Sequence, residues 1–298
     1  MNPSPAMNAD EVTIFNRDVR ASVRSFGAEL VRLQDGAGAD YLWNGDPAWW
    51  SGRSPILFPI VGALREGRLK VDGMAFAMAQ HGFARLSAFE TIVREDTHCA
   101  FRLLPSRETR AQYPFEFELR LDYEVIGRAL SMRTSITNTG SGPMPASFGF
   151  HPAFRWPLAG DLSRTAYSIT FDRPEVAPVE RPAEGGLLSG TPRPSPVIGK
   201  KLALSDSLFE EGALIFRGLE SRRVTYGAAT GPRIVVSFDG LPDLGIWTKP
   251  GAGFVCIEPW HGYASPGDFD GALRDKPGIM LIEAGTTRQL EMRIEISR

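Results

Sequence analysis

The dominant pattern along the chain is an alternation of apolar and polar positions. In residues 117–125 every second residue is apolar, and the residues between them are charged. The alternation continues in residues 130–136 and returns in residues 290–296. A period of two predicts β-strands with one face on a core and the other in water. Because half-polar strands are typical of antiparallel sheets, the pattern favours an antiparallel architecture.

Shorter apolar segments extend this prediction over most of the chain. Further strands are expected at residues 12–15, 29–33, 69–71, 89–93, 166–171, 213–216, 222–226, 234–238 and 254–257. Gly127-Arg128 predicts a hairpin turn between the first two alternating segments. Helical periodicity is weak, and only residues 205–211 predict a helix, of two turns at most. Strands punctuated by 31 Gly and 23 Pro predict an all-β protein, a sandwich or barrel with few short helices.

One composition shift bears on domain organisation. Residues 174–201 are rich in proline, glycine and charge. The segment is either a domain linker or a long surface excursion within one domain. We expect the excursion, because the strand pattern is of the same kind on both sides. Residues 1–298 are therefore predicted to form a single domain, with residues 1–10 as a flexible N-terminus.

Composition and charge exclude several classes of function. The chain is 43% hydrophobic and 23% charged, which is ordinary for a globular protein. The net charge of -2 and the absence of long like-charge runs argue against nucleic-acid or membrane partners. Residues 1–10 lack the basic and apolar stretches of a signal peptide. Cys99 and Cys256 have neither metal-ligand nor redox spacing, so a reducing cytoplasm is expected.

Three segments break the alternation with residues that a plain sandwich does not need. Residues 80–85 carry His81 between a glutamine and a glycine, and residues 148–154 carry His151 among three phenylalanines. Residues 254–262 contain Glu258 as the one charge in an apolar, aromatic run. Burial would lower the pKa of a histidine, which keeps the imidazole uncharged, and would raise the pKa of a carboxyl group towards 7. General acid–base catalysis at neutral pH requires groups of this kind.

Each of these residues also has a plain structural interpretation. His81 could be a turn histidine that donates to a carbonyl, and His151 a hydrogen-bonded core histidine. Glu258 could reach solvent at a strand end before Pro259. His98, in the polar segment 94–98, is interpreted as a turn residue without function. Because the four histidines stand singly, no metal site is predicted, and no phosphate loop, dinucleotide fingerprint or nucleophile elbow occurs.

Five motifs in fixed order carry a family resemblance. They are Ser-Pro-Ile-Leu-Phe-Pro-Ile-Val-Gly at 54–62, Gln-His-Gly-Phe-Ala-Arg at 80–85, Gly-Phe-His-Pro-Ala-Phe at 149–154, Leu-Gly-Ile-Trp-Thr-Lys-Pro at 244–250 and Cys-Ile-Glu-Pro-Trp at 256–260. Together they resemble the aldose 1-epimerase (galactose mutarotase-like) superfamily, and most its LacX-type branch. The resemblance runs from about residue 12 to residue 296.

The resemblance implies a large antiparallel β-sandwich of the galactose mutarotase type, with a sugar cleft across one sheet. It implies that Glu258 is the general base at the anomeric hydroxyl and His151 the general acid at the ring oxygen. His81 matches a second histidine that holds and polarises the sugar. The implied reaction interconverts the α and β anomers of a hexose and needs no cofactor.

Sugar-binding residues are predicted around this centre. The candidates are Arg65, Arg85, Asp206, Trp247, Lys249 and Trp260. Aromatic rings suit the apolar C–H faces of a pyranose, and charged groups suit its hydroxyls. Two positions depart from the family pattern. Ala63 stands where relatives often have arginine, with Arg65 or Arg53 as replacements, and Gly212 stands where an acid is common, with Asp206 as the candidate.

Three alternatives stay open at this stage. A sugar sensor on the same fold would bind without turnover, and a hydrolase or lyase would call for two facing carboxylates, of which only Glu258 is evident. A hexose phosphate could replace the free hexose, with Lys249, Arg65 and Arg85 as available cations. The expected partner is a small sugar, with no nucleic acid and no membrane, and the protein is expected to be a monomer or homodimer.

Overall fold

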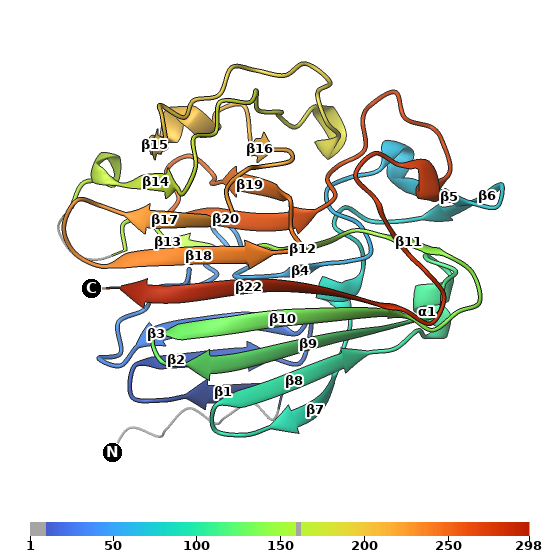
Figure 1. The fold of residues 1–298 in the computed structure, drawn as a ribbon, viewed down its shortest axis with the longest axis horizontal. Helices are drawn as coiled ribbons and strands as arrows, with labels where there is room; N and C mark the ends of the chain where they lie inside the picture. Colours follow the sequence, from blue (N-terminus) through green and yellow to red (C-terminus); the bar gives the residue numbers. More distant parts are fainter. Residues whose placement is uncertain (1–9, 159–161, 298) are drawn as a thin grey trace.

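The alternating segments form the long strands of a nine-stranded antiparallel sheet (Figure 1). The computed structural model describes residues 10–158 and 162–297. In spatial order the strands of this sheet are β15 (Lys201–Ala203), β14 (Ser168–Phe171), β17 (Arg223–Gly227), β18 (Arg233–Asp239), β22 (Thr287–Ser297), β10 (Ala129–Asn138), β9 (Phe117–Ile126), β8 (His98–Leu103) and β7 (Glu90–Arg94). The predicted hairpin joins β9 to β10, with Ile126 paired to Ala129.

A six-stranded sheet packs against the long one. Its members are β16 (Leu214–Phe216), β19 (Asp243–Trp247), β20 (Phe254–His261), β12 (Phe148–Phe150), β4 (Ile56–Leu57) and β13 (Ala153–Arg155), the last paired with β20. Side chains of both sheets belong to one buried core, for example Leu121 of β9, Ile294 of β22 and Ile257 of β20. Each fully buried side chain of this kind stabilises the fold by roughly 1.5–3 kcal/mol. The predicted all-β sandwich with few short helices is confirmed.

Smaller ribbons and single turns complete the architecture. The ribbons are β1 (Glu11–Phe15), β2 (Val19–Arg24) and β3 (Glu29–Asp35); β5 (Arg68–Val71) with β6 (Met74–Ala77); and β11 (Met144–Ala146) with β21 (Met280–Ile282). The helical turns are α1 (Arg107–Arg110), η1 (Arg65–Gly67), η2 (Ala84–Leu86), η3 (Arg164–Ala166), η4 (Glu184–Gly186), η5 (Asp206–Phe209) and η6 (Leu273–Asp275). No helix among the described residues is long and apolar enough to span a membrane.

Several boundaries differ from the sequence prediction. The strand expected at 166–171 begins only at Ser168, because η3 occupies Arg164–Ala166. The helix expected at 205–211 is the 3₁₀ turn Asp206–Phe209. His98 opens β8 rather than lying in a turn, and its Nε2 is 2.9 Å from Asp122 Oδ1. This surface pair gives His98 a structural partner.

The proline-rich segment 174–201 runs over one end of the six-stranded sheet. Glu180 forms a bridge with Ile215 of β16, and Leu188 forms one with Pro266. These backbone bridges place Pro182 and Gly186 beside the cavity described below. Of the predicted flexible N-terminus, residues 1–9 lie outside the described residues.

Candidate active site

Strand β20 presents its side chains to two environments. Val255 and Ile257 lie in the main core between the sheets. Cys256 and Trp260 belong to two smaller clusters of buried residues. Because alternate residues of a strand share a face, Glu258 points to the same side as Cys256 and Trp260. The chemistry of the site therefore lies on the face of the six-stranded sheet that is turned away from the main core.

Glu258 lies well inside β20 and not at its end. The strand continues through Pro259 to His261, and Glu258 is only 2% exposed. The interpretation of Glu258 as a strand-end residue in solvent is therefore wrong. A carboxyl in this position needs a polar partner, since burying an unpaired charge is costly.

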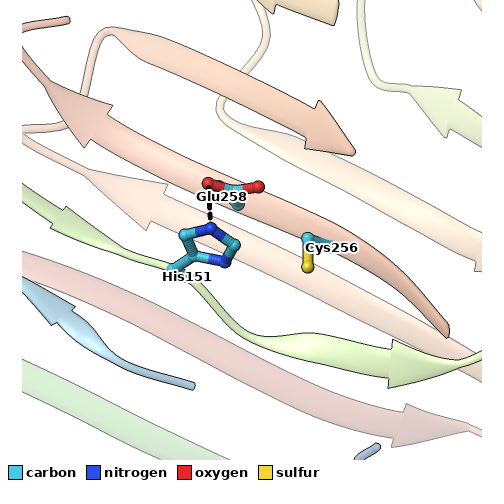
Figure 2. A group of neighbouring side chains, drawn as sticks. All are labelled: His151, Cys256 and Glu258. Carbon is cyan, nitrogen blue, oxygen red and sulfur yellow. Dashed lines mark ion pairs between the residues drawn. The ribbon is translucent and has the colours of Figure 1, made fainter. Parts of the chain in front are cut away.

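His151 supplies that partner. It lies in the short connection between β12 and β13, two strands that both pair with β20, so the connection carries the imidazole to Glu258. His151 Nε2 is 3.2 Å from Glu258 Oε2 (Figure 2). His151 itself is 8% exposed. The structure thus brings together two of the residues that the sequence analysis singled out.

The pKa values of the pair are displaced in opposite directions. Burial raises the pKa of Glu258 well above its ordinary value. Burial, with smaller contributions in the same direction from His81 and Arg85, holds the pKa of His151 well below 6.5. A second proton would leave a buried cation, and losing the last proton would leave a buried anion. Burial therefore favours the state in which the pair holds one shared proton.

His81 is fixed in one tautomer. Its backbone takes a φ of 65°, in the left-handed region, and Gly82 follows with a φ of 72°. The Gly62 N–H donates to His81 Nδ1 at 3.1 Å, so the neutral ring carries its proton on Nε2. Burial and Arg85 lower the pKa of His81 to about 3. His81 is consequently a neutral hydrogen-bond donor at pH 7, and its side chain accepts from the backbone rather than donating to it.

A cavity of about 370 Å³ opens over the pair. Its polar lining groups are Gln80, His81, Arg85, His151 and Glu258, and its aromatic walls are Trp50, Trp247 and Trp260. The volume lies in the range of roughly 300–1,000 Å³ that is usual for small-molecule sites. A few convergent polar groups within apolar walls suit a ligand that is both ring-shaped and polar.

Trp260 forms one wall of this cavity, and its ring fits there because its neighbours lack side chains. A Cβ on Gly149 would lie 2.4 Å from the Trp260 ring, and one on Gly245 would lie 2.3 Å from it. Gly149 and Gly245 belong to β12 and β19, the strands on either side of β20. The indole therefore lies flat across three strands.

Gly245→Ala is expected to displace Trp260 and to destabilise the protein by about 1–3 kcal/mol, because overpacking moves a large ring. Thermal unfolding and sugar affinity, followed by tryptophan fluorescence, measure the two effects. Gly142→Ala is the matched control, since a Cβ at Gly142 meets nothing within 4 Å. Equal behaviour of the two variants would contradict the proposed role of Gly245.

The predicted sugar-binding residues divide into two groups. Arg85, Trp247 and Trp260 line the cavity with the three predicted catalytic residues. Arg65, Asp206 and Lys249 are not among its lining residues. These three predictions gain no support from the geometry.

Each of the three residues outside the cavity has another setting. Arg65 is exposed in η1. Asp206 accepts from Arg164 and from the Gly251 N–H, and so ties two loops together. Lys249 is exposed and lies over the ring of Trp49, 5.8 Å from its centroid.

Trp50 is a site residue that the sequence analysis missed. Its ring stacks on His151 with 5.0 Å between centroids and 29° between planes, and meets Trp247 edge-on. A stacked aromatic face fixes the imidazole and favours its protonated form. No motif marks Trp50, because it lies in a turn-rich segment whose path over the sheet is a tertiary feature. Gly212, which the sequence analysis placed where an acid is expected, lines the cavity without contributing a side chain.

Solved structures share this fold. A galactose mutarotase related enzyme from Lactobacillus acidophilus superimposes with a TM-score of 0.90 at 29% identity, covering 97% of each chain. A galactose mutarotase-like protein from Lactobacillus casei gives 0.89 at 28% identity, covering 96% of this chain and all of the other. The sandwich is therefore a galactose mutarotase-like fold.

Sequence comparison assigns the family. Residues 10–267 match the family described as Aldose 1-epimerase. The chromosomal protein LacX of Lactococcus lactis is 31% identical over 282 residues, or 90% of this chain and 93% of LacX. The chain belongs to the aldose 1-epimerase family, and within it to the LacX-type branch.

Proposed function

We propose that this protein is an aldose 1-epimerase, which interconverts the α and β anomers of a hexose. The observation that carries the proposal is the buried pair of His151 and Glu258, 3.2 Å apart on the floor of a sugar-sized cavity. A binding protein needs no matched acid and base. The pair also accounts for the proton transfers that anomerisation requires.

Ring opening follows from the protonation states of the pair. In the reactive state Glu258 is ionised and His151 is protonated. Glu258 takes the proton of the anomeric hydroxyl while His151 gives its proton to the ring oxygen, and the bond between C1 and the ring oxygen breaks. The pair ends as a neutral carboxylic acid and a neutral imidazole, with its total proton number unchanged. Burial disfavours the ionised state of the pair and so favours the proton transfers that end in the neutral state.

Ring closure reverses these transfers on the other face of the aldehyde. After rotation about the C1–C2 bond, the neutral imidazole removes the proton from the hydroxyl that attacks C1. Glu258 then protonates the new anomeric oxygen. His81 donates from Nε2 to the sugar throughout, because its Nδ1 is occupied by Gly62. The reaction is an isomerisation without net oxidation, so we expect no cofactor.

Proton NMR of freshly dissolved α-glucose, α-galactose and glucose 6-phosphate tests the proposal. Faster equilibration of the anomeric signals than in buffer is the expected result for one or more of these sugars. Line broadening without acceleration would contradict turnover and favour a sugar sensor. Neither effect on any of these sugars would contradict the proposal for them.

Arg85 favours a hexose phosphate as the second candidate substrate. It lines the cavity and its Nη2 donates to the Gln80 carbonyl at 3.0 Å. Among the described residues no carboxylate lies within ion-pair distance of Arg85, and its Nε has no partner. Burial lowers the pKa of this guanidinium. A partly buried cation without an anion suits a phosphate group.

Arg85→Met is expected to raise KM for glucose 6-phosphate by about 10- to 100-fold if the phosphate binds here, since charged hydrogen bonds contribute about 1.5–3 kcal/mol. KM for glucose should change much less. Measuring KM for both sugars by NMR or polarimetry shows whether Arg85 binds the phosphate. A similar change for both would assign Arg85 to the hexose itself.

A further inference from the structure

A third metal-ligating side chain lies beside the acid–base pair. Cys256 precedes Glu258 by two residues on β20, so both side chains project from the same face. One ligand atom each from His151, Cys256 and Glu258 lies within 4.8 Å of the other two. Figure 2 shows the carboxylate and the thiol along one strand, with the imidazole beside them. The proposed acid–base mechanism does not use the thiol.

The three side chains that carry these ligand atoms are all buried. Cys256 is fully buried, in a cluster with Trp43 and Phe254 against which Trp50 and Trp247 pack. Nitrogen, oxygen and sulfur ligands are thus gathered in one buried place.

We propose that His151, Cys256 and Glu258 form an inhibitory binding site for a soft divalent cation, Zn²⁺ or Cd²⁺. The cation would replace the protons of the acid–base pair and so block anomerisation. The inhibitory effect rests on the proposed function, whereas the binding itself does not.

The distance between the imidazole and carboxylate ligands suits a tetrahedral ion. Zinc bonds of 2.0–2.1 Å to nitrogen and oxygen imply a ligand–ligand separation of about 3.3 Å. The observed distance between His151 Nε2 and Glu258 Oε2 is 3.2 Å. Of the three residues, His151 and Glu258 line the cavity and Cys256 does not. The fourth position therefore faces the cavity, where water or a sugar hydroxyl can occupy it.

The charges of the ligands match those of the ion. A thiolate and a carboxylate together with a neutral imidazole carry two negative charges, so a bound Zn²⁺ leaves no net charge in the buried site.

The ligand set gives the site a clear selectivity. Mg²⁺ and Ca²⁺ should not compete, because they prefer six or more oxygen ligands. Surface carboxylates would not show this selectivity.

The first experiment measures binding without reference to activity. Tag-free protein is treated with a chelator and titrated with Co²⁺ and Cd²⁺, and thiolate-to-metal charge-transfer absorption is recorded. One equivalent is expected to produce the band in the native chain and in Cys99→Ala, a matched loss of the other buried cysteine. Cys256→Ser and Cys256→Ala should lack the band. Circular dichroism confirms that each variant is folded.

The second experiment measures inhibition of mutarotation by Zn²⁺, each variant against its own metal-free rate. The Cys256 variants are expected to need at least tenfold more Zn²⁺ than the native chain. No charge-transfer band in the native protein would overturn the site, and so would equal binding by native and Cys256→Ala chains. A band in a protein that accelerates no sugar would leave the site standing and remove the proposed function instead.

Discussion

Glu258→Gln is expected to lower kcat for anomerisation by about 10²–10⁴-fold, because the amide cannot accept the proton of the anomeric hydroxyl. Glutamine keeps the size of the side chain and a hydrogen-bonding group opposite His151. Sugar affinity should therefore change little. The rate is followed by polarimetry or by exchange between anomeric NMR signals, with affinity taken from line broadening.

A matched control separates the lost base from the lost buried charge. Glu175 is also buried, at 5% exposure, and its Oε1 accepts from the Ser221 N–H at 2.7 Å. An amide oxygen can still accept this hydrogen bond, so Glu175→Gln should keep its rate. A Glu258→Gln protein with full activity would remove the assignment of the base.

Sequence periodicity predicts the strands that have one buried face and one solvent-exposed face. In β9 buried and half-exposed residues alternate along nearly the whole strand, so the pattern of residues 117–125 predicts this strand correctly. Strands with both faces buried carry no such signal. All three residues of β12 are buried, as are the first four of β19, so neither strand shows an alternation. In β2 a bulge between Ser22 and Val23 breaks the alternation.

The predicted catalytic residues of the site could be found from the sequence more readily than the residues around them. His81, His151 and Glu258 interrupt apolar or strand-like segments, and all three line the cavity. Lys249 was predicted beside Trp247, but it lies beyond the end of β19 and its side chain is exposed. The direction of a loop after its strand depends on tertiary packing, which adjacency in sequence does not encode.

Long-range convergence is the other feature that sequence does not show. The spacing of Cys256 predicts neither a metal site nor a redox site. The antiparallel pairing of β13 with β20 sets Ala153 opposite Cys256, and so brings the nearby His151 to the thiol. Trp50 reaches the same imidazole from the segment that precedes β4. A short motif can therefore identify an acid or a base, but it does not identify the distant residues that position it and shift its pKa.

His151→Asn is expected to cost about 10²–10⁴-fold in kcat, and the double variant with Glu258→Gln should be no slower than the slower single variant. The two residues exchange protons in one concerted cycle, so either loss removes the whole pathway. Independent contributions would instead multiply. Rates of the two single variants and the double variant, measured at saturating sugar, give the coupling directly.

The pH profile provides the second part of this test. The native rate should be level around neutral pH, where the pair holds one proton. It should fall in acid, when a second proton prevents Glu258 from accepting, and in alkali, when the last proton leaves. With His151 replaced, only the loss of rate in acid should remain. Burial still raises the pKa of Glu258, so the residual rate should rise with pH until this carboxyl ionises. Multiplicative losses with an unchanged profile would show that the two residues do not act as a pair.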